Sequence, residues 1–129
     1  MNATERINTL TGAVVDAAFK VHSTLGPGLL ESAYEVCLAH ELRQRGFAVQ
    51  RQVEMPIEYE GIKIDAGYRL DLIVENEVVI ELKAVQELLP IHEAQLLTYL
   101  RLSGMKAGLL INFNQRLLKD GIKRMVNDL

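Results

Sequence analysis

The sequence has no tryptophan and few aromatic residues of any kind, because aromatic side chains make up only 5% of its 129 residues. A surface that binds nucleic acid by stacking bases needs aromatic rings, so this composition argues against a base-stacking platform. Cysteine occurs once, at Cys37, which excludes an internal disulfide and a zinc site built from several cysteines. A single thiol fits a reducing compartment, so we expect a cytoplasmic protein.

Positive charge is also scarce. Fourteen lysine and arginine residues stand against seventeen aspartate and glutamate residues, which gives a formal net charge of −3. Proteins that coat nucleic acid are usually basic, so a contact with nucleic acid here must be local or must use metal ions to offset carboxylates. Long apolar runs are missing too, and the first six residues are polar. These features predict neither a membrane span nor a signal peptide.

The chain length and the spacing of apolar residues predict one domain, residues 1–129, of the α/β or α+β class. Helical spacing predicts helices at 7–25, 29–45, 90–103 and 116–126, and strand-like segments lie at 47–54, 57–64, 68–74, 78–85 and 107–113. A strand, helix, strand return implies a right-handed crossover with parallel pairing. The expected fold is therefore a mixed central sheet flanked by helices, with an N-terminal helical pair.

Two neighbouring strands carry charged residues at alternating positions, and side chains alternate between the faces of a strand. The apolar positions of both strands are expected to form the core side: Leu70, Leu72, Val74, Val78, Ile80 and Leu82. The opposite face carries Arg69 and Asp71 on one strand and Glu81 and Lys83 on the other. A three-residue turn at 75–77 places Asp71 directly across from Glu81, where Cβ atoms of cross-strand neighbours are about 4.5–5.5 Å apart.

This carboxylate pair has two interpretations. Two carboxylates at that distance repel each other unless positive charge lies between them. A divalent cation that prefers oxygen ligands supplies that charge, and Lys83, on the same face as Glu81, can neutralise a phosphate or help to activate a water. Alternatively, Arg69 and Lys83 simply form ion pairs with Asp71 and Glu81 on a solvated strand face.

The order of motifs along the chain resembles that of a known family. Asp71, followed by residues 81–83 (ELK), resembles the D…(D/E)-x-K signature of the PD-(D/E)XK, or restriction-endonuclease-like, nuclease superfamily. Residues 95–99 (QLLTY) are similar to the Q-x-x-x-Y motif of its RecB-like branch. Residues 28–34 (GLLESAY) are similar to the motif that names the GxxExxY family, a member group of that superfamily. The resemblance covers nearly the whole chain, although Leu70 replaces the proline of the superfamily's name.

The resemblance implies a fold and a set of roles. The superfamily core is a helix, a three-stranded meander, a helix and a further strand, which agrees with the expected order of elements. Asp71 and Glu81, with the Leu82 carbonyl, would hold a metal ion, and Glu31, on the helix before the meander, would complete the site directly or through water. Lys83 would steady the attacking hydroxide or the scissile phosphate. Otherwise, Glu31 is a surface carboxylate in the first turn of its helix, where the helix dipole favours it.

Four further residues have two interpretations each. Gln95 and Tyr99 lie one helical turn apart and would contact phosphate or position Lys83. Alternatively, Tyr99 packs on the sheet. Tyr34 would orient Glu31, or it belongs to the core. His22, late in the first helix, is a partner of the helix dipole, or it reaches the metal cleft as an acid or base.

The one basic cluster lies on the last expected helix. It consists of Arg116, Lys119, Lys123 and Arg124. Such a strip is either a solvated helix face or a contact for phosphate.

Together these features predict a Mg²⁺- or Mn²⁺-dependent nuclease that hydrolyses phosphodiester bonds in nucleic acid, with DNA as the expected partner and no membrane partner. The alternative is a catalytically silent nuclease-fold module that binds a protein or a nucleic acid. The complete set of Glu31, Asp71, Glu81 and Lys83 favours the enzyme, because a site without catalysis has no reason to keep all four. We also consider a homodimer, formed through an edge strand or the first helix.

Overall fold

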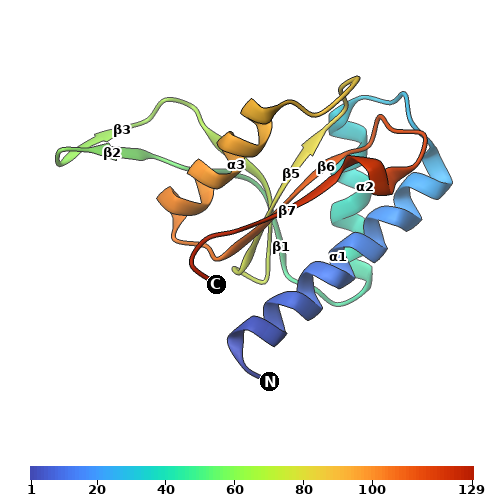
Figure 1. Cartoon of the computed structure of the whole chain (residues 1–129), viewed down its shortest axis with the longest axis horizontal. Helices are drawn as coiled ribbons and strands as arrows, with labels where there is room; N and C mark the ends of the chain where they lie inside the picture. The colour runs from blue at the N-terminus through green and yellow to red at the C-terminus, as the bar shows by residue number, and fades with distance from the viewer.

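The computed structural model describes residues 1–129 and contains three α-helices, one short 3₁₀ helix and seven strands (Figure 1). The helices are α1 (Ala3–Leu25), α2 (Glu31–Gln44), α3 (Pro90–Ser103) and the 3₁₀ helix η1 (Leu118–Gly121). The strands are β1 (Val49–Glu54), β2 (Ile57–Tyr59), β3 (Ile62–Ile64), β4 (Arg69–Val74), β5 (Val78–Lys83), β6 (Ala107–Asn112) and β7 (Ile122–Val126). No helix combines the length and the apolar character needed to cross a membrane.

Five strands form the central sheet in the order β1-β4-β5-β6-β7. Strands β5 and β6 are parallel, and α3 connects them, whereas every other neighbouring pair is antiparallel. The predicted mixed sheet flanked by helices is therefore confirmed. Helices α1 and α2 cover one face and α3 covers the other, while the β2–β3 hairpin projects away from the sheet beside α3 (Figure 1).

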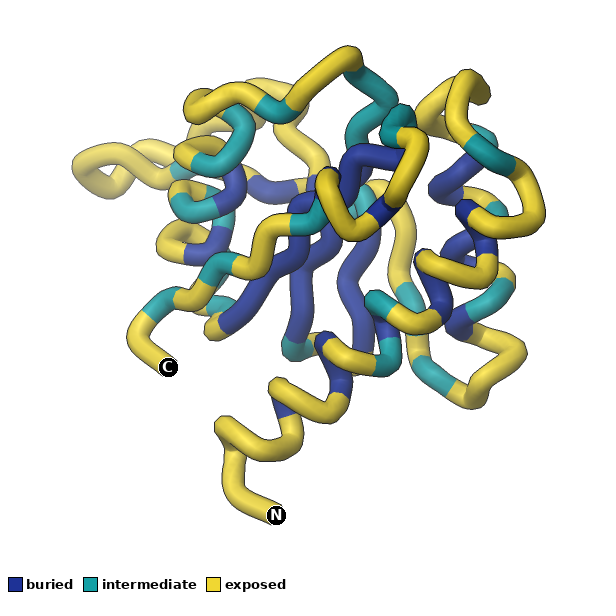
Figure 2. The backbone as a smooth tube through the Cα atoms, turned by 45° about the vertical axis from the view of Figure 1, so that its right-hand side comes forward, coloured by how far each residue is buried: buried dark blue, intermediate teal, exposed yellow.

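The three central strands, β4, β5 and β6, are mostly buried (Figure 2). An apolar cluster lies on each face of the sheet that they form. Under α1 and α2, the larger cluster includes five apolar residues of the central hairpin: Leu72, Val74, Val78, Ile80 and Leu82. Under α3, the smaller cluster joins Ile73 and Val79 to Leu96 and Leu100. The face opposite the main core is thus a second core for most of its length, and charged residues occupy only one end of it.

Leu70 is the exception to the predicted alternation. It is buried, but it packs in the smaller cluster with Met55 and not with its five predicted companions. Leu70 lies two residues beyond the last β4–β5 pair, Leu72 with Ile80. At that end β4 is held only by β1, so the strand is free to twist and turn the Leu70 side chain toward α3.

The predicted helix at 116–126 is wrong. Residues 118–121 form the short η1, and residues 122–126 form β7, which pairs antiparallel with β6. All six residues of β6 are buried, so its backbone groups need hydrogen-bond partners on both sides, and β7 supplies them on the side away from β5. The expected basic strip is lost, because Lys123 and Arg124 alternate on a strand and Arg124 donates a hydrogen bond to Asn8 of α1.

Candidate active site

Asp71 and Glu81 face each other where the β4–β5 pairing ends. The last paired residues are Leu72 and Ile80, and beyond them the two carboxylates accept backbone N–H groups of the opposite strand. The N–H of Leu82 donates to Asp71 Oδ2 at 2.8 Å, and the N–H of Asp71 donates to Glu81 Oε1 at 3.2 Å. The predicted register is therefore observed, and the two carboxyl groups bridge the strands at the point where the backbone ladder stops.

These two carboxyl groups are poorly solvated and resist ionisation. Glu81 is only 7% exposed, and its burial, followed by the nearby Asp71, raises its pKa to about 8. Burial likewise raises the pKa of Asp71, with Glu35 adding to the effect. The N–H of Leu82 and the charge of Lys83 act in the opposite direction on Asp71. Without a cation, the pair therefore retains a proton near neutral pH.

No basic side chain forms an ion pair with either carboxylate. Arg69 pairs with Glu54 at 3.1 Å, on the edge strand β1, and Lys83 forms no ion pair with any acidic residue within 4.0 Å. Lys83 is half-buried nearby, and its charge lowers the pKa of Asp71 and Glu81. The interpretation in which Arg69 and Lys83 neutralise the pair as ion-pair partners is thus not realised.

Glu31 lies in the exposed first turn of α2 and points toward the same charges. Partial burial raises its pKa, with Asp71 as the second cause, while Lys83 opposes the shift. The turn before α2 is held by Tyr34, which is buried, donates its hydroxyl proton to the Gly26 carbonyl and accepts the N–H of Leu29. Tyr34 thus makes no hydrogen bond to Glu31 and instead anchors the loop from which the Glu31 helix begins.

Two further residues of the site were missed by the sequence analysis. Glu35, one turn after Glu31, is 5% exposed and accepts hydrogen bonds from Arg51 at 3.0 Å and from Gln52 Nε2 at 2.5 Å. Gln52 also donates to Asp71 Oδ1 at 3.3 Å, so it links Glu35 to the carboxylate pair. Both positions carry a detectable signal, since Glu35 is four residues from Glu31 on the same helix face and Gln52 lies between two pairs that frame Asp71 in the β1–β4 register.

Gln52 reaches both carboxylates from an unusual backbone conformation. Its φ angle is +51° within β1, in the left-handed region that side chains other than glycine rarely adopt. Such backbone strain is maintained where the surroundings hold the residue in place, and it is common at functional sites. Here the hydrogen bonds to Glu35 and Asp71 provide that hold.

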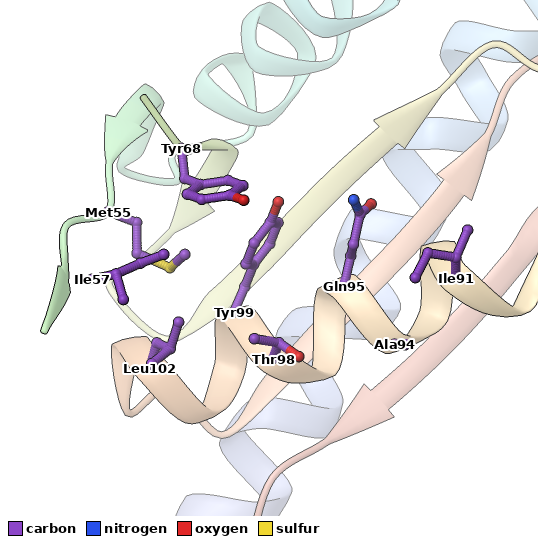
Figure 3. A pocket seen from close by; sticks show the side chains of 9 residues that line it. All are labelled: Met55, Ile57, Tyr68, Ile91, Ala94, Gln95, Thr98, Tyr99 and Leu102. Carbon is purple, nitrogen blue, oxygen red and sulfur yellow. The ribbon is translucent and has the colours of Figure 1, made fainter. Parts of the chain in front are cut away.

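Gln95 and Tyr99 lie on one side of α3 and point the same way (Figure 3). Burial raises the pKa of Tyr99, and the next causes are Glu81, Tyr68 and Asp71. Tyr99 is therefore close enough to the carboxylate pair to sense its charge. Tyr68, which precedes β4, was not selected from the sequence, yet its ring lies 6.1 Å from that of Tyr99.

His22 makes its contacts elsewhere. It is buried, its Nε2 lies 2.7 Å from the carbonyl oxygen of Gln115, and its ring lies 6.4 Å from that of Phe113. Tyr34 stacks on the same Phe113 ring at 4.6 Å. His22 therefore ties α1 to the loop after β6, and its contacts are those of a structural residue.

The donor set suits a hard divalent cation in an open site. No group of three or more His, Cys, Asp or Glu side chains is close enough to enclose a metal ion, so the protein offers no closed cage. It offers two adjacent carboxylates without a cationic partner, and Mg²⁺ typically takes one or two carboxylates together with water and substrate phosphate. Asp71 and Glu81 fit this pattern, and Asp71 is near enough to Glu31 to help raise the pKa of Glu31.

Comparison with known proteins agrees with this donor set. A family model described as the PD-(D/E)XK nuclease superfamily matches residues 8–125, which is more than nine-tenths of the chain. Nucleases of that superfamily generally use divalent metal ions. No curated protein gives a significant match. No solved structure gives a significant match either.

Proposed function

The chain belongs to the PD-(D/E)XK nuclease superfamily, and from that premise we propose that it hydrolyses phosphodiester bonds in nucleic acid with the help of Mg²⁺ or Mn²⁺. One observation carries the proposal: the buried Glu81 and the half-buried Asp71 lie side by side, and no basic side chain forms an ion pair with either. An uncompensated acidic pair destabilises a fold that has no use for it, whereas a bound cation converts the pair into a favourable contact.

The proposal gives each residue of the site a separate role. Asp71 and Glu81, with the Leu82 carbonyl, would hold the metal, and Glu31 would bind it directly or through a water molecule. When bound, such a cation lowers the pKa of a water molecule and shields charge that develops on the phosphate. Lys83, half-buried beside the pair, holds the attacking hydroxide or the scissile phosphate by its positive charge.

Gln52 and Glu35 act as positioning residues. Gln52 binds one oxygen of Asp71 and is itself held by the buried Glu35. A ligand carboxylate that accepts a hydrogen bond from a fixed neighbour loses rotational freedom, and such outer contacts commonly affect metal affinity and activity. We therefore assign the two residues to the orientation of Asp71.

The finer identity of the protein follows the motif at the start of α2. We place the chain in the GxxExxY group, because Gly28, Glu31 and Tyr34 occur at its spacing and Tyr34 anchors the loop that precedes Glu31. We further propose DNA as the substrate and a homodimer as the assembly. The single thiol, at Cys37, fits the reducing cytoplasm proposed as its compartment.

The test is a cleavage assay with matched variants. Circular single-stranded and duplex DNA and RNA are incubated with the protein in Mg²⁺, in Mn²⁺ and in chelator. We expect metal-dependent cleavage by the wild type and by the control Asp16→Asn, and none by Asp71→Asn. Asp16 is an exposed carboxylate paired with Arg45, which caps the far end of α2 from Glu31, so its removal leaves the site intact.

Two results would overturn the proposal. The first is the absence of cleavage of all four substrates in either metal, which would favour the alternative of a silent binding module. The second is equal cleavage by Asp71→Asn and by Asp16→Asn, which would show that the reaction does not depend on the carboxylate pair.

A further inference from the structure

An apolar groove runs between α3 and the residues on either side of the β2–β3 hairpin (Figure 3). Its volume is about 200 Å³. The side chains that define it include Met55, Ile57, Tyr68, Ile91, Gln95 and Tyr99. Pockets for drug-sized ligands usually span roughly 300–1,000 Å³, so this groove has the size of one small ring system and is too small for a large cofactor.

The groove approaches the candidate active site at Tyr68, which lines it and directly precedes β4, the strand that carries Asp71. The Tyr99 side chain lines the groove, and its pKa is raised in part by Glu81 and Asp71. Figure 3 shows the Tyr99 hydroxyl and the Gln95 amide leaving α3 in the same direction, while Ile57 and Met55 lie across the groove from that helix. A molecule in the groove would therefore have one polar edge and a largely apolar floor.

Charge decides which part of a nucleotide this groove can hold. No lysine or arginine lines it, and the nearest charged groups that affect Tyr99 are carboxylates. A phosphate would have no positive partner there, so the groove does not suit the backbone of a nucleic acid. A nucleobase is uncharged, planar and rimmed by polar atoms, which matches an apolar floor beside an amide and two phenolic hydroxyls.

Tyr68 and Tyr99 can contact a base in two ways, through the face of one ring and the edge of the other. Their ring centroids are 6.1 Å apart, and their planes are tilted by 58°, so a base can stack on one ring and meet the other at an angle. Tyr68 is 43% exposed, which leaves its ring accessible. The low aromatic content argued against a broad stacking platform, but the fold brings two of the four tyrosines together in this groove.

We propose that this groove binds one unpaired nucleobase of the substrate strand, next to the bond that is cleaved. The inference rests on the proposed function, and it names the substrate class: single-stranded nucleic acid, or a strand with locally unpaired bases. A base within a duplex is stacked and paired, so it can enter the groove only after it is extruded. Base–aromatic stacking tolerates every base, so little sequence preference is expected.

The test compares two tyrosines of the same segment. Tyr68→Leu removes the groove ring but keeps apolar bulk, and Tyr59→Leu is the control, since Tyr59 is 63% exposed and lies outside the groove. Ile91→Glu provides a second groove variant at a position that is 59% exposed, where the fold tolerates a polar side chain. Thermal melting establishes that all three variants are folded.

Binding is measured by fluorescence anisotropy in Ca²⁺, another cation with oxygen ligands, with a labelled single-stranded DNA oligonucleotide, its duplex and a strand that carries abasic positions. We expect the wild type to prefer the intact single strand. Tyr68→Leu and Ile91→Glu should bind it about tenfold more weakly, the loss of roughly one stacked base. Tyr59→Leu should bind as the wild type does, and the KM for single-strand cleavage in Mg²⁺ should rise in the groove variants.

The results separate this inference from the proposed function. Metal-dependent cleavage that is equal on duplex and single strand, and unchanged by both groove variants, would overturn the groove assignment and leave the nuclease intact. Binding of the abasic strand as tightly as the intact strand would also overturn it, because the groove would then hold something other than a base. Tyr68-dependent binding of single strands by a protein that cleaves nothing would support the groove and refute the hydrolysis.

Discussion

The substitution Glu81→Gln should stabilise the metal-free protein, and it should do so increasingly as the pH rises. Glu81 is buried, and its pKa is raised to about 8 by that burial and by Asp71. Glutamine preserves the length of the side chain and the oxygen that accepts the N–H of Asp71, but it carries no charge at any pH. The variant therefore removes the cost of ionising a carboxyl group beside another carboxylate.

The sign and the size of the effect follow from proton linkage. Between the ordinary pKa of 4.5 and the raised value of about 8, the folded state binds more protons at Glu81 than the unfolded state does. The stability that this proton provides is complete below pH 4.5 and is lost as the pH rises through 8. The total loss is at most roughly 5 kcal/mol, and relaxation of the site should reduce it to about 1–3 kcal/mol.

Denaturant unfolding in chelator measures this difference. Midpoints and slopes are recorded for the wild type and for Glu81→Gln between pH 5 and pH 9, and the difference between the two proteins cancels the contributions of titrating groups that do not interact with Glu81. We expect the variant to gain on the wild type as the pH rises and to level off above pH 8. A difference that stays constant over this range, or that favours the wild type at pH 9, would refute the reasoning.

Three shorter predictions concern the metal, the loop before α2 and the end of the sheet. Mg²⁺ or Mn²⁺ at ten times its Kd should stabilise the wild type by about 1.4 kcal/mol, which raises the melting temperature by roughly 5 °C. This rise should vanish in Glu81→Ala. An equal rise in both proteins would show that the ion binds elsewhere. Tyr34→Phe removes a buried hydroxyl with two hydrogen-bond partners and should cost about 1–2 kcal/mol in urea unfolding, whereas an unchanged midpoint would contradict the anchoring role. Gly121→Ala should cost about 1–3 kcal/mol, because a Cβ there would lie 2.6 Å from the Asn112 carbonyl oxygen; a neutral substitution would mean that η1 can move away from β6.

The central hairpin and α3 are predictable because local rules and tertiary packing agree there. Residues 90–103 begin with Pro90 and end before Gly104, and the helix has those bounds, with Gly104 at a φ of +75° as a left-handed cap. The turn at 75–77 sets the register that brings Asp71 across from Glu81. In these segments the turn residues alone specify which side chains meet.

The C-terminal segment is not predictable in the same way, because its structure depends on a distant neighbour. Residues 116–126 carry apolar residues at spacings that fit a helix as well as a strand, and periodicity over so short a segment does not separate the two. The deciding interaction is the pairing of Ile122–Val126 with the buried strand β6. Since that partner lies elsewhere in the chain, only the assembled sheet makes the strand the better solution.

Glu35, Gln52 and Tyr68 escaped prediction for a related reason. The motifs in the sequence indicate the proposed ligands themselves, whereas Glu35 and Gln52 reach Asp71 only through hydrogen bonds between segments: Glu35 holds Gln52, and Gln52 contacts Asp71. Their types are unremarkable for a helix, a strand and a loop. The packing of α2 against β1 and β4 brings Glu35 to Gln52, and the packing of α3 brings Tyr99 to Tyr68. Both contacts join segments that are distant in the sequence.

The position of the carboxylate pair explains how the fold tolerates it. The backbone ladder of β4 and β5 ends at Leu72 and Ile80, and beyond them Asp71 and Glu81 each accept a backbone N–H of the opposite strand. A cation that draws these carboxylate oxygens outward therefore competes with two hydrogen bonds and leaves the ladder itself unchanged. Apolar clusters on both faces hold the strands in place, and neither Asp71 nor Glu81 belongs to those clusters. We therefore expect a substitution at Asp71 to abolish the proposed metal-dependent cleavage while the sheet remains folded.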